Sequence, residues 1–80
     1  MVKYKIKSYG IAKDILGERT VTIETNARTV GELRSWLTDK YPSLTELRSL
    51  FIAVNQNYAE DGIGLSETDE IVLIPPVSGG

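Results

Sequence analysis

The sequence predicts a two-layer α+β fold, in which one sheet packs on a single long helix. Three features support this prediction: an alternating N-terminal segment, one amphipathic segment in the middle, and a short apolar segment near residue 74. A chain of 80 residues can bury one small hydrophobic core. We therefore expect one domain over residues 1–74 and an extended C-terminal tail over residues 75–80.

The N-terminal segment predicts two strands joined by a helical turn. Residues 2–9 alternate strictly, which is typical of a strand with one wet face. Residues 11–16 fit a short helical turn that Gly17 closes, and residues 19–25 alternate again. The first strand should place Val2, Tyr4, Ile6 and Ser8 on one face and Lys3, Lys5, Lys7 and Tyr9 on the other.

The central segment predicts the long helix. Thr29 and Glu32 have the spacing of a capping box, in which Thr29 accepts from a backbone N–H of the first turn and Glu32 reaches back. Apolar residues then recur at helical spacing until Pro42 ends the run. Residues 43–46 repeat the capping pattern, so a second, short helix is expected to begin there.

The C-terminal half predicts three further strands. Residues 52–54 and 58–59 fit two short strands around a turn at residues 55–57. After a polar loop, residues 71–74 are apolar at every position, which predicts a strand buried on both faces.

One long helix covers only one face of a sheet, so the apolar residues on the other face of the last strand need a separate explanation. Side chains alternate along a strand, so Val72 and Ile74 lie opposite the face that packs on the helix. Together with Tyr9 they predict an apolar patch outside the core. Such a patch fits a partner-binding surface, and the alternative is the ordinary scatter of apolar residues on a protein surface.

Composition excludes several function classes. The chain has 9 Lys and Arg against 11 Asp and Glu, a net charge of −2, which argues against nucleic acid as a partner. It has no cysteine and no histidine, so we expect no metal site, no bound cofactor and no catalytic centre of its own. No leader-like or membrane-spanning run is evident, and a cytoplasmic protein is expected.

The C-terminal tail has a composition suited to entering a partner. Pro75 and Pro76 lack N–H donors and stop the sheet, so the chain should leave it in an extended form. Gly79 and Gly80 have no Cβ and fit a narrow channel. The alternative is a frayed chain end without function.

These residues together carry a family resemblance. The motifs are Ser8-Tyr9-Gly10 leading to Leu16-Gly17, Ala53-Val54-Asn55-Gln56, Asp69-Glu70-Ile71, and Ile74-Pro75-Pro76-Val77-Ser78-Gly79-Gly80. The chain resembles the MoaD family, the small subunit of molybdopterin synthase, which is a ubiquitin-like β-grasp sulfur carrier. The resemblance implies a mixed sheet of four to five strands packed on one long helix, with short helices besides.

The resemblance also implies a chemistry at Gly80. In the family, an ATP-dependent activating enzyme adenylates the terminal glycine, and a sulfur donor protein converts it to a thiocarboxylate. The tail then enters the large synthase subunit, in a heterotetramer, and sulfur passes to cyclic pyranopterin monophosphate for molybdenum cofactor synthesis. The chain is thus expected to be a sulfur-carrying, non-catalytic subunit, with Pro75, Pro76, Val77, Ser78 and Gly79 presenting Gly80.

Position by position, the family's partner-facing residues fall on Tyr9, Lys13, Tyr58 and Ile74. Many relatives have an aromatic residue where this chain has Ile74, and some have arginine where it has Lys13. Lys13 could equally be a solvated helix residue, and Tyr58 could pack on its own sheet.

Other functions stay open: a ubiquitin-like modifier conjugated through Gly80, a sulfur carrier of another pathway such as thiamine synthesis, or a passive interaction module.

Overall fold

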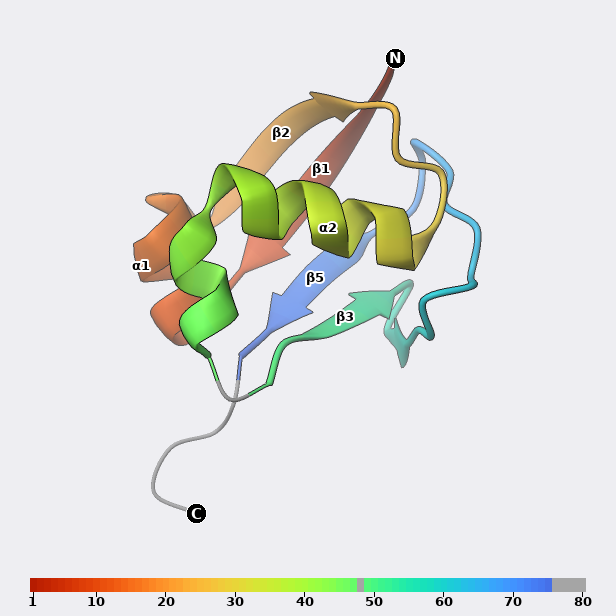
Figure 1. Cartoon of the computed structure of the whole chain (residues 1–80). Coiled ribbons are helices and arrows are strands. Elements are labelled where there is room, and N and C mark those ends of the chain that lie inside the picture. Colours follow the sequence, from red (N-terminus) through yellow and green to blue (C-terminus); the bar gives the residue numbers. More distant parts are fainter. Residues whose placement is uncertain (48, 76–80) are drawn as a thin grey trace.

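The computed structural model describes residues 1–47 and 49–75 of the chain (Figure 1). Five strands and two α-helices follow one another with a short 3₁₀ helix, η1, after the long helix. Their bounds are β1 (Val2–Ser8), α1 (Gly10–Leu16), β2 (Thr20–Thr25), α2 (Val30–Lys40), η1 (Pro42–Glu46), β3 (Phe51–Val54), β4 (Asn57–Tyr58) and β5 (Ile71–Ile74). The order confirms the α+β prediction.

The five strands form one mixed sheet in the order β2-β1-β5-β3-β4. β1 pairs antiparallel with β2 and parallel with β5, and β5 pairs antiparallel with β3. The first and last strands in sequence therefore lie side by side in the centre of the sheet, as Figure 1 shows. The C-terminal tail therefore starts from the end of β5, in the centre of the sheet.

The hydrophobic core lies between α2 and one face of the sheet (Figure 1). The alternation predicted for β1 is confirmed, because Tyr4, Ile6 and Ser8 are fully buried. The buried polar side chains have partners: the Ser8 hydroxyl donates to the Glu18 carbonyl at 3.0 Å, and Thr25 Oγ1 accepts from the Ala27 N–H at 3.1 Å. From the other elements, the core takes Ile23, Val30, Leu33, Leu37, Leu44, Ile52, Ile71 and Leu73.

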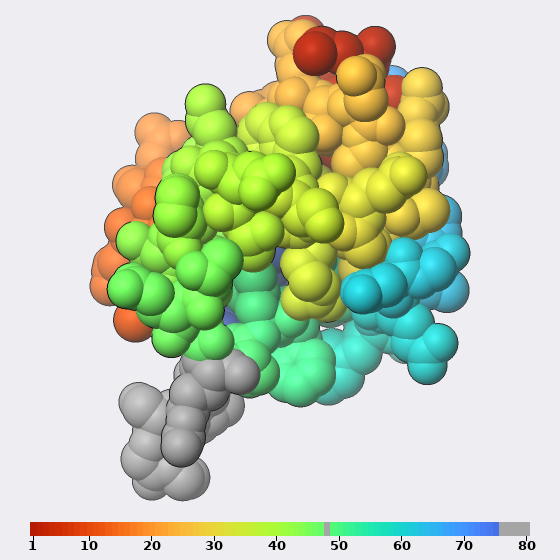
Figure 2. Space-filling model, viewed as in Figure 1, coloured from red at the N-terminus to blue at the C-terminus, as the bar shows by residue number. Residues whose placement is uncertain are grey.

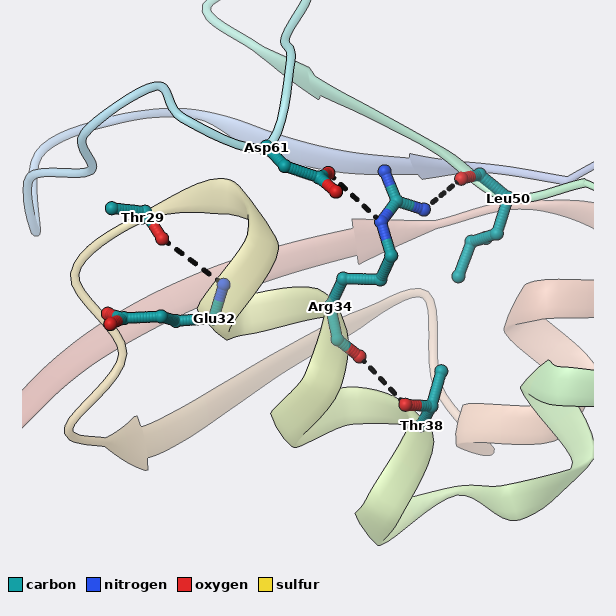
Figure 3. A network of polar contacts seen from close by, with 6 residues as sticks. All are labelled: Thr29, Glu32, Arg34, Thr38, Leu50 and Asp61. Atoms are coloured by element: carbon teal, nitrogen blue, oxygen red, sulfur yellow. Dashed lines mark hydrogen bonds and ion pairs between the residues drawn. The ribbon is translucent and has the colours of Figure 1, made fainter.

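The N-terminus of α2 is capped as predicted, with one difference. Thr29 Oγ1 accepts from the Glu32 N–H at 3.2 Å, as Figure 3 shows. The Glu32 carboxylate does reach back, but it accepts from the N–H of Arg28 at 2.7 Å and not from that of Thr29. One backbone donor in the first turn of the helix and one ahead of the helix are satisfied in this way.

The loop between β4 and β5 is fastened to α2, and Figure 2 shows its cyan atoms against the yellow start of the helix. The backbone N–H groups of Val30 and Gly31 donate to the carbonyls of Ile63 and Asp61, both at 2.9 Å. One turn along the helix, Arg34 pairs with the Asp61 carboxylate at 3.3 Å and also donates to the Leu50 carbonyl (Figure 3). Arg34 therefore joins α2, the loop and the segment that enters β3.

The predicted capping of the second helix is wrong. η1 begins at Pro42, not Ser43, and no side chain caps it. The reason is that proline at the first helical position has its φ already fixed and has no N–H that needs a cap. Thr45 instead donates its hydroxyl to the Pro42 carbonyl at 2.6 Å.

The boundaries of β3 and β4 also differ from the prediction. β3 begins one residue earlier, at Phe51, and β4 covers Asn57–Tyr58. The turn between them has two residues, Asn55 and Gln56, both with positive φ (52° and 72°). That conformation matches the twist of a tight hairpin, so pairing resumes directly at Asn57.

β5 is buried fully on one face only. Ile71 and Leu73 are 0% exposed beneath α2, whereas Val72 and Ile74 on the opposite face are half-buried. The prediction of complete burial on both faces is therefore wrong for the second face, because α2 packs against only one side of the sheet (Figure 1).

Candidate functional site

The face of the sheet opposite α2 carries a contiguous apolar area on three strands. The pairing register places Phe51 opposite Ile74 and Ala53 opposite both Val72 and Tyr58. All five side chains share this face, because Ile52, Ile71 and Leu73 between them point into the core. We name Phe51, Ala53, Tyr58, Val72 and Ile74 the apolar sheet face.

Four residues of the apolar sheet face, Ala53, Tyr58, Val72 and Ile74, line a surface hollow together with the polar residues Gln56, Asn57 and Glu70. Apolar residues combined with polar ones are typical of a protein-binding surface. Three residues predicted from the sequence, Tyr58, Val72 and Ile74, are thus brought together here.

Phe51 belongs to this face and was missed by the sequence analysis. Its ring stacks on that of Tyr58 with centroids 5.4 Å apart and an angle of 26° between the planes. Phe51 remains 50% exposed and Tyr58 71% exposed, so the pair presents aromatic surface to the solvent. The sequence gives no signal for its face, because residues 50–54 are apolar at every position and do not alternate.

The end of β5 lies against the start of α1. Gly10 has a φ of +57°, and a Cβ placed on it would lie 3.7 Å from Cγ of Pro75. Tyr9, just before it, is extended and 49% exposed. Since Lys7 and Ser8 pair with Val72 and Leu73, the same register continued would set Tyr9 beside Ile74. Tyr9 therefore lies at the point where the tail starts, which we name the tail root.

Lys13 lies on α1, one turn beyond Tyr9, with an exposed side chain. It does not line the hollow, and the ion pairs among residues 1–47 and 49–75 do not involve it. The remaining predicted residues, Pro76, Val77, Ser78, Gly79 and Gly80, lie outside the described residues.

On the part of this face that β1 forms, most of the positive charge of the lysines is neutralised by carboxylates of the same chain. Lys7 pairs with Glu70 at 3.1 Å and Lys3 approaches Glu24 at 3.9 Å. Lys5 and Lys7 line a second hollow together with Glu67, Asp69 and Glu70. This half of the sheet therefore offers no concentrated positive charge for a phosphate group.

Within residues 1–47 and 49–75, no three His, Cys, Asp or Glu side chains gather closely enough to hold a metal ion. Across the same part of the chain, none of the helices has the length and hydropathy needed to cross a membrane.

Comparison with known proteins decides the family. The family model described as the ThiS family matches residues 6–80. The chain belongs to the ThiS/MoaD family. Among curated relatives, the molybdopterin synthase sulfur carrier subunit of Caenorhabditis briggsae is 39% identical, over 100% of this chain and 100% of that protein. The resemblance found in the sequence is confirmed.

Solved structures confirm the ubiquitin-like β-grasp fold of this ThiS/MoaD chain. One is small archaeal modifier protein 1 (SAMP1) from Methanosarcina acetivorans, with 26% identity, a TM-score of 0.79, and coverage of 100% of this chain and 98% of that one. Another is the complex of subunits 1 and 2 of molybdopterin-converting factor from Helicobacter pylori. It matches with 29% identity, a TM-score of 0.69, and coverage of 99% and 100%.

Proposed function

We propose that this chain is the sulfur carrier subunit of a molybdopterin synthase. The observation that carries the proposal is the full-length alignment, at 39% identity, with a protein of that name. The complex of subunits 1 and 2 of molybdopterin-converting factor supports a large subunit as the partner. The chain's own contribution is a folded domain that presents Gly80 to the partner.

The proposed chemistry takes place at the carboxylate of Gly80. A carboxylate is ionised at pH 7 and is a poor electrophile, so it must be activated. Its oxygen attacks the α-phosphorus of ATP on an activating enzyme, and pyrophosphate leaves. Sulfur at the oxidation level of sulfide, delivered by a sulfur donor protein, then displaces AMP and leaves a thiocarboxylate. No redox change occurs on the chain, and the catalytic groups belong to the partners.

The next step delivers the sulfur. The tail enters the large subunit, and the thiocarboxylate sulfur passes to cyclic pyranopterin monophosphate as part of molybdenum cofactor synthesis. Water supplies the oxygen that restores the Gly80 carboxylate, which can be activated again. Two such transfers supply the two sulfur atoms of a dithiolene, in keeping with a heterotetramer that holds two small and two large subunits.

The domain supports this role through its exposed apolar surface. The apolar sheet face ends at Ile74, and Pro75 follows directly from it against Gly10. A partner that packs on this face therefore meets the tail root at the same time. We assign Tyr58, Val72, Ile74 and Tyr9 to this contact, with Lys13 at its margin, where a flexible cation suits an acidic group of the partner.

Sulfur transfer with altered chain ends tests the proposal. The thiocarboxylated chain, mixed with its large subunit and the pyranopterin substrate, should yield product in proportion to the sulfur supplied. Deleting Gly80, or adding one residue after it, should abolish the transfer while the thermal unfolding of the domain stays unchanged. Full product formation with the truncated chain would refute the proposal, because the sulfur would then not be carried on Gly80.

A second candidate function is protein modification through Gly80. The specific observation is the 26% identity with small archaeal modifier protein 1. An isopeptide bond from Gly80 to lysines of many cellular proteins would favour it, whereas a chain found only as carboxylate and thiocarboxylate would not.

Complementation distinguishes the proposed function from that of a sulfur carrier for thiamine synthesis. The chain should restore a molybdoenzyme-deficient strain and not a thiamine auxotroph.

A further inference from the structure

The sheet has one long outer strand. β2 and β4 are the two strands at its margins. β4 has two residues, whereas β2 has six, from Thr20 to Thr25. β2 pairs with β1 along one side, and its other side forms the outer margin of the sheet (Figure 1). The backbone of β2 is therefore bonded on one side only.

The hydrogen bonds between β1 and β2 show which residues turn outward. The Ser8 N–H donates to the Arg19 carbonyl at 2.8 Å, so these two residues form a hydrogen-bonded pair. Bonded and non-bonded pairs alternate along an antiparallel ladder, so β2 bonds to β1 through its odd-numbered residues. The residues that turn their backbone N–H and C=O groups outward are Thr20, Thr22 and Glu24, which we name the open edge. Among residues 1–47 and 49–75 these outward groups have no hydrogen-bond partner.

The open edge lacks the features that usually protect an outer strand from pairing. Such features are proline, lysine, a β-bulge or a very short strand. β2 reads Thr-Val-Thr-Ile-Glu-Thr, and its pairing with β1 runs without a bulge. Threonine, valine and isoleucine also favour the extended backbone. The open edge is therefore a template on which another strand can pair.

The sequence of β2 fits a second copy of itself. In an antiparallel pair centred on Thr22, each Thr22 faces its counterpart and Thr20 faces Glu24, so every outward N–H and C=O obtains a partner. On the core side of the sheet, the half-buried Val21 then lies opposite Ile23. Glu24 meets a threonine and not a second carboxylate, and a net charge of −2 opposes association only weakly. This is the one antiparallel register in which the residues of the open edge pair only with each other.

We propose that two copies of this chain pair through their open edges and form a dimer with one continuous sheet. The two-fold axis passes beside Thr22. β1 separates β2 from β5, so the apolar sheet face of each copy stays accessible in the dimer. The pairing does not depend on the chemistry at Gly80.

Variants at Thr22 test the backbone pairing. Thr22→Pro removes the N–H at the centre of the dimer, and an edge strand tolerates proline where its N–H faces solvent. Thr22→Ala removes the side chain but keeps the N–H, so it is the matched control. Thr22→Lys, a second disrupting variant, sets two lysines opposite each other.

Sedimentation equilibrium of the full chain, up to about 1 mM, measures the Kd of the dimer. We expect wild type and Thr22→Ala to dimerise with Kd values within about threefold of each other. Thr22→Pro and Thr22→Lys should raise the Kd at least about tenfold. Circular dichroism with thermal unfolding verifies that the variants fold.

Cross-linking tests the register, because the chain has no cysteine of its own. The Cα atoms of a hydrogen-bonded antiparallel pair lie about 5.5 Å apart, which suits a disulfide. Thr22→Cys should therefore form a disulfide-linked dimer on mild oxidation. Thr20→Cys and Glu24→Cys should link to each other when mixed, and neither should link to itself. Ser35→Cys, exposed on α2, is the control and should stay unlinked.

Three results would overturn the proposal. The first is a wild-type chain that stays monomeric up to about 1 mM. The second is a dimer that folded Thr22→Pro and Thr22→Lys leave intact, because the contact would then lie elsewhere. The third is linking of Ser35→Cys as efficient as that of Thr22→Cys, because the disulfides would then report random collisions.

Discussion

The ring of Phe51 stacks on the ring of Tyr58, with centroids 5.4 Å apart, on the face of the sheet away from α2. Both rings are at least half exposed, although aromatic side chains usually find burial in a domain of this size. Because Phe51 pairs with Ile74, the stacked pair stands next to the point where the tail begins. A surface of this kind is typical of the energetic centre of a protein interface.

Removing one ring of this pair should weaken binding to the large subunit far more than it destabilises the fold. Phe51→Ala is expected to raise the Kd for the large subunit by about 10- to 100-fold, as truncated aromatic anchors do, and to lower the free energy of unfolding by less than about 1.5 kcal/mol. Calorimetry and urea denaturation measure the two effects. Thr22→Ala, on the polar β2 edge of the same face, is the control and should change neither quantity appreciably. Wild-type affinity in Phe51→Ala would contradict the assignment.

Arg34 should matter more for stability than its ion pair suggests. Arg34→Met keeps the aliphatic stem but loses both the Asp61 carboxylate and the Leu50 carbonyl, so we expect a loss of about 1–3 kcal/mol in urea denaturation. Asp61→Asn removes only the exposed partner and should cost less than about 1 kcal/mol. Equal losses in the two variants would show that the Leu50 contact contributes nothing.

Tyr4 should make the free energy of unfolding of the domain depend on pH in the alkaline range. Its hydroxyl donates to the Ala27 carbonyl at 2.7 Å, and burial raises its pKa above the ordinary value of 10.0, partly opposed by the Arg28 charge. Because the folded pKa lies above the unfolded one, the stabilising effect is complete below about pH 10 and is lost as pH rises through the folded pKa.

Comparison with Tyr4→Phe isolates this effect from the other titrating groups. Below about pH 10 the variant should be less stable than wild type by about 1–3 kcal/mol, because the Ala27 carbonyl loses its partner. Above pH 10 the difference in the free energy of unfolding should shrink. Urea denaturation from pH 7 to 11 measures it, and a difference that stays constant across this range would contradict the account.

Most of the fold follows from local patterns in the sequence. Strict alternation placed Tyr4, Ile6 and Ser8 on the buried face of β1, and the Thr29 cap located the start of α2. These predictions hold because one strand face or one helix turn contains all the residues involved. The predicted start of η1 was wrong, because Pro42 fixes the first helical position without a side-chain cap. The capping pattern that begins at Ser43 therefore has no role there.

The site was predicted less completely, since it depends on pairing between distant strands. Val72 and Ile74 stand out because a wholly apolar strand must show one face away from the helix. Phe51 belongs to an apolar run from residue 50 to 54 that has no alternation, so only its pairing with Ile74 reveals its face.

The mass of the intact chain identifies the atom that Gly80 carries. Incubated with its activating enzyme, ATP and a sulfur donor, the chain should gain the mass difference of one oxygen replaced by one sulfur. Fragmentation should place that difference on Gly80, and omission of ATP should abolish it. An unmodified chain, in the presence of partners shown to be active on another carrier, would contradict the account.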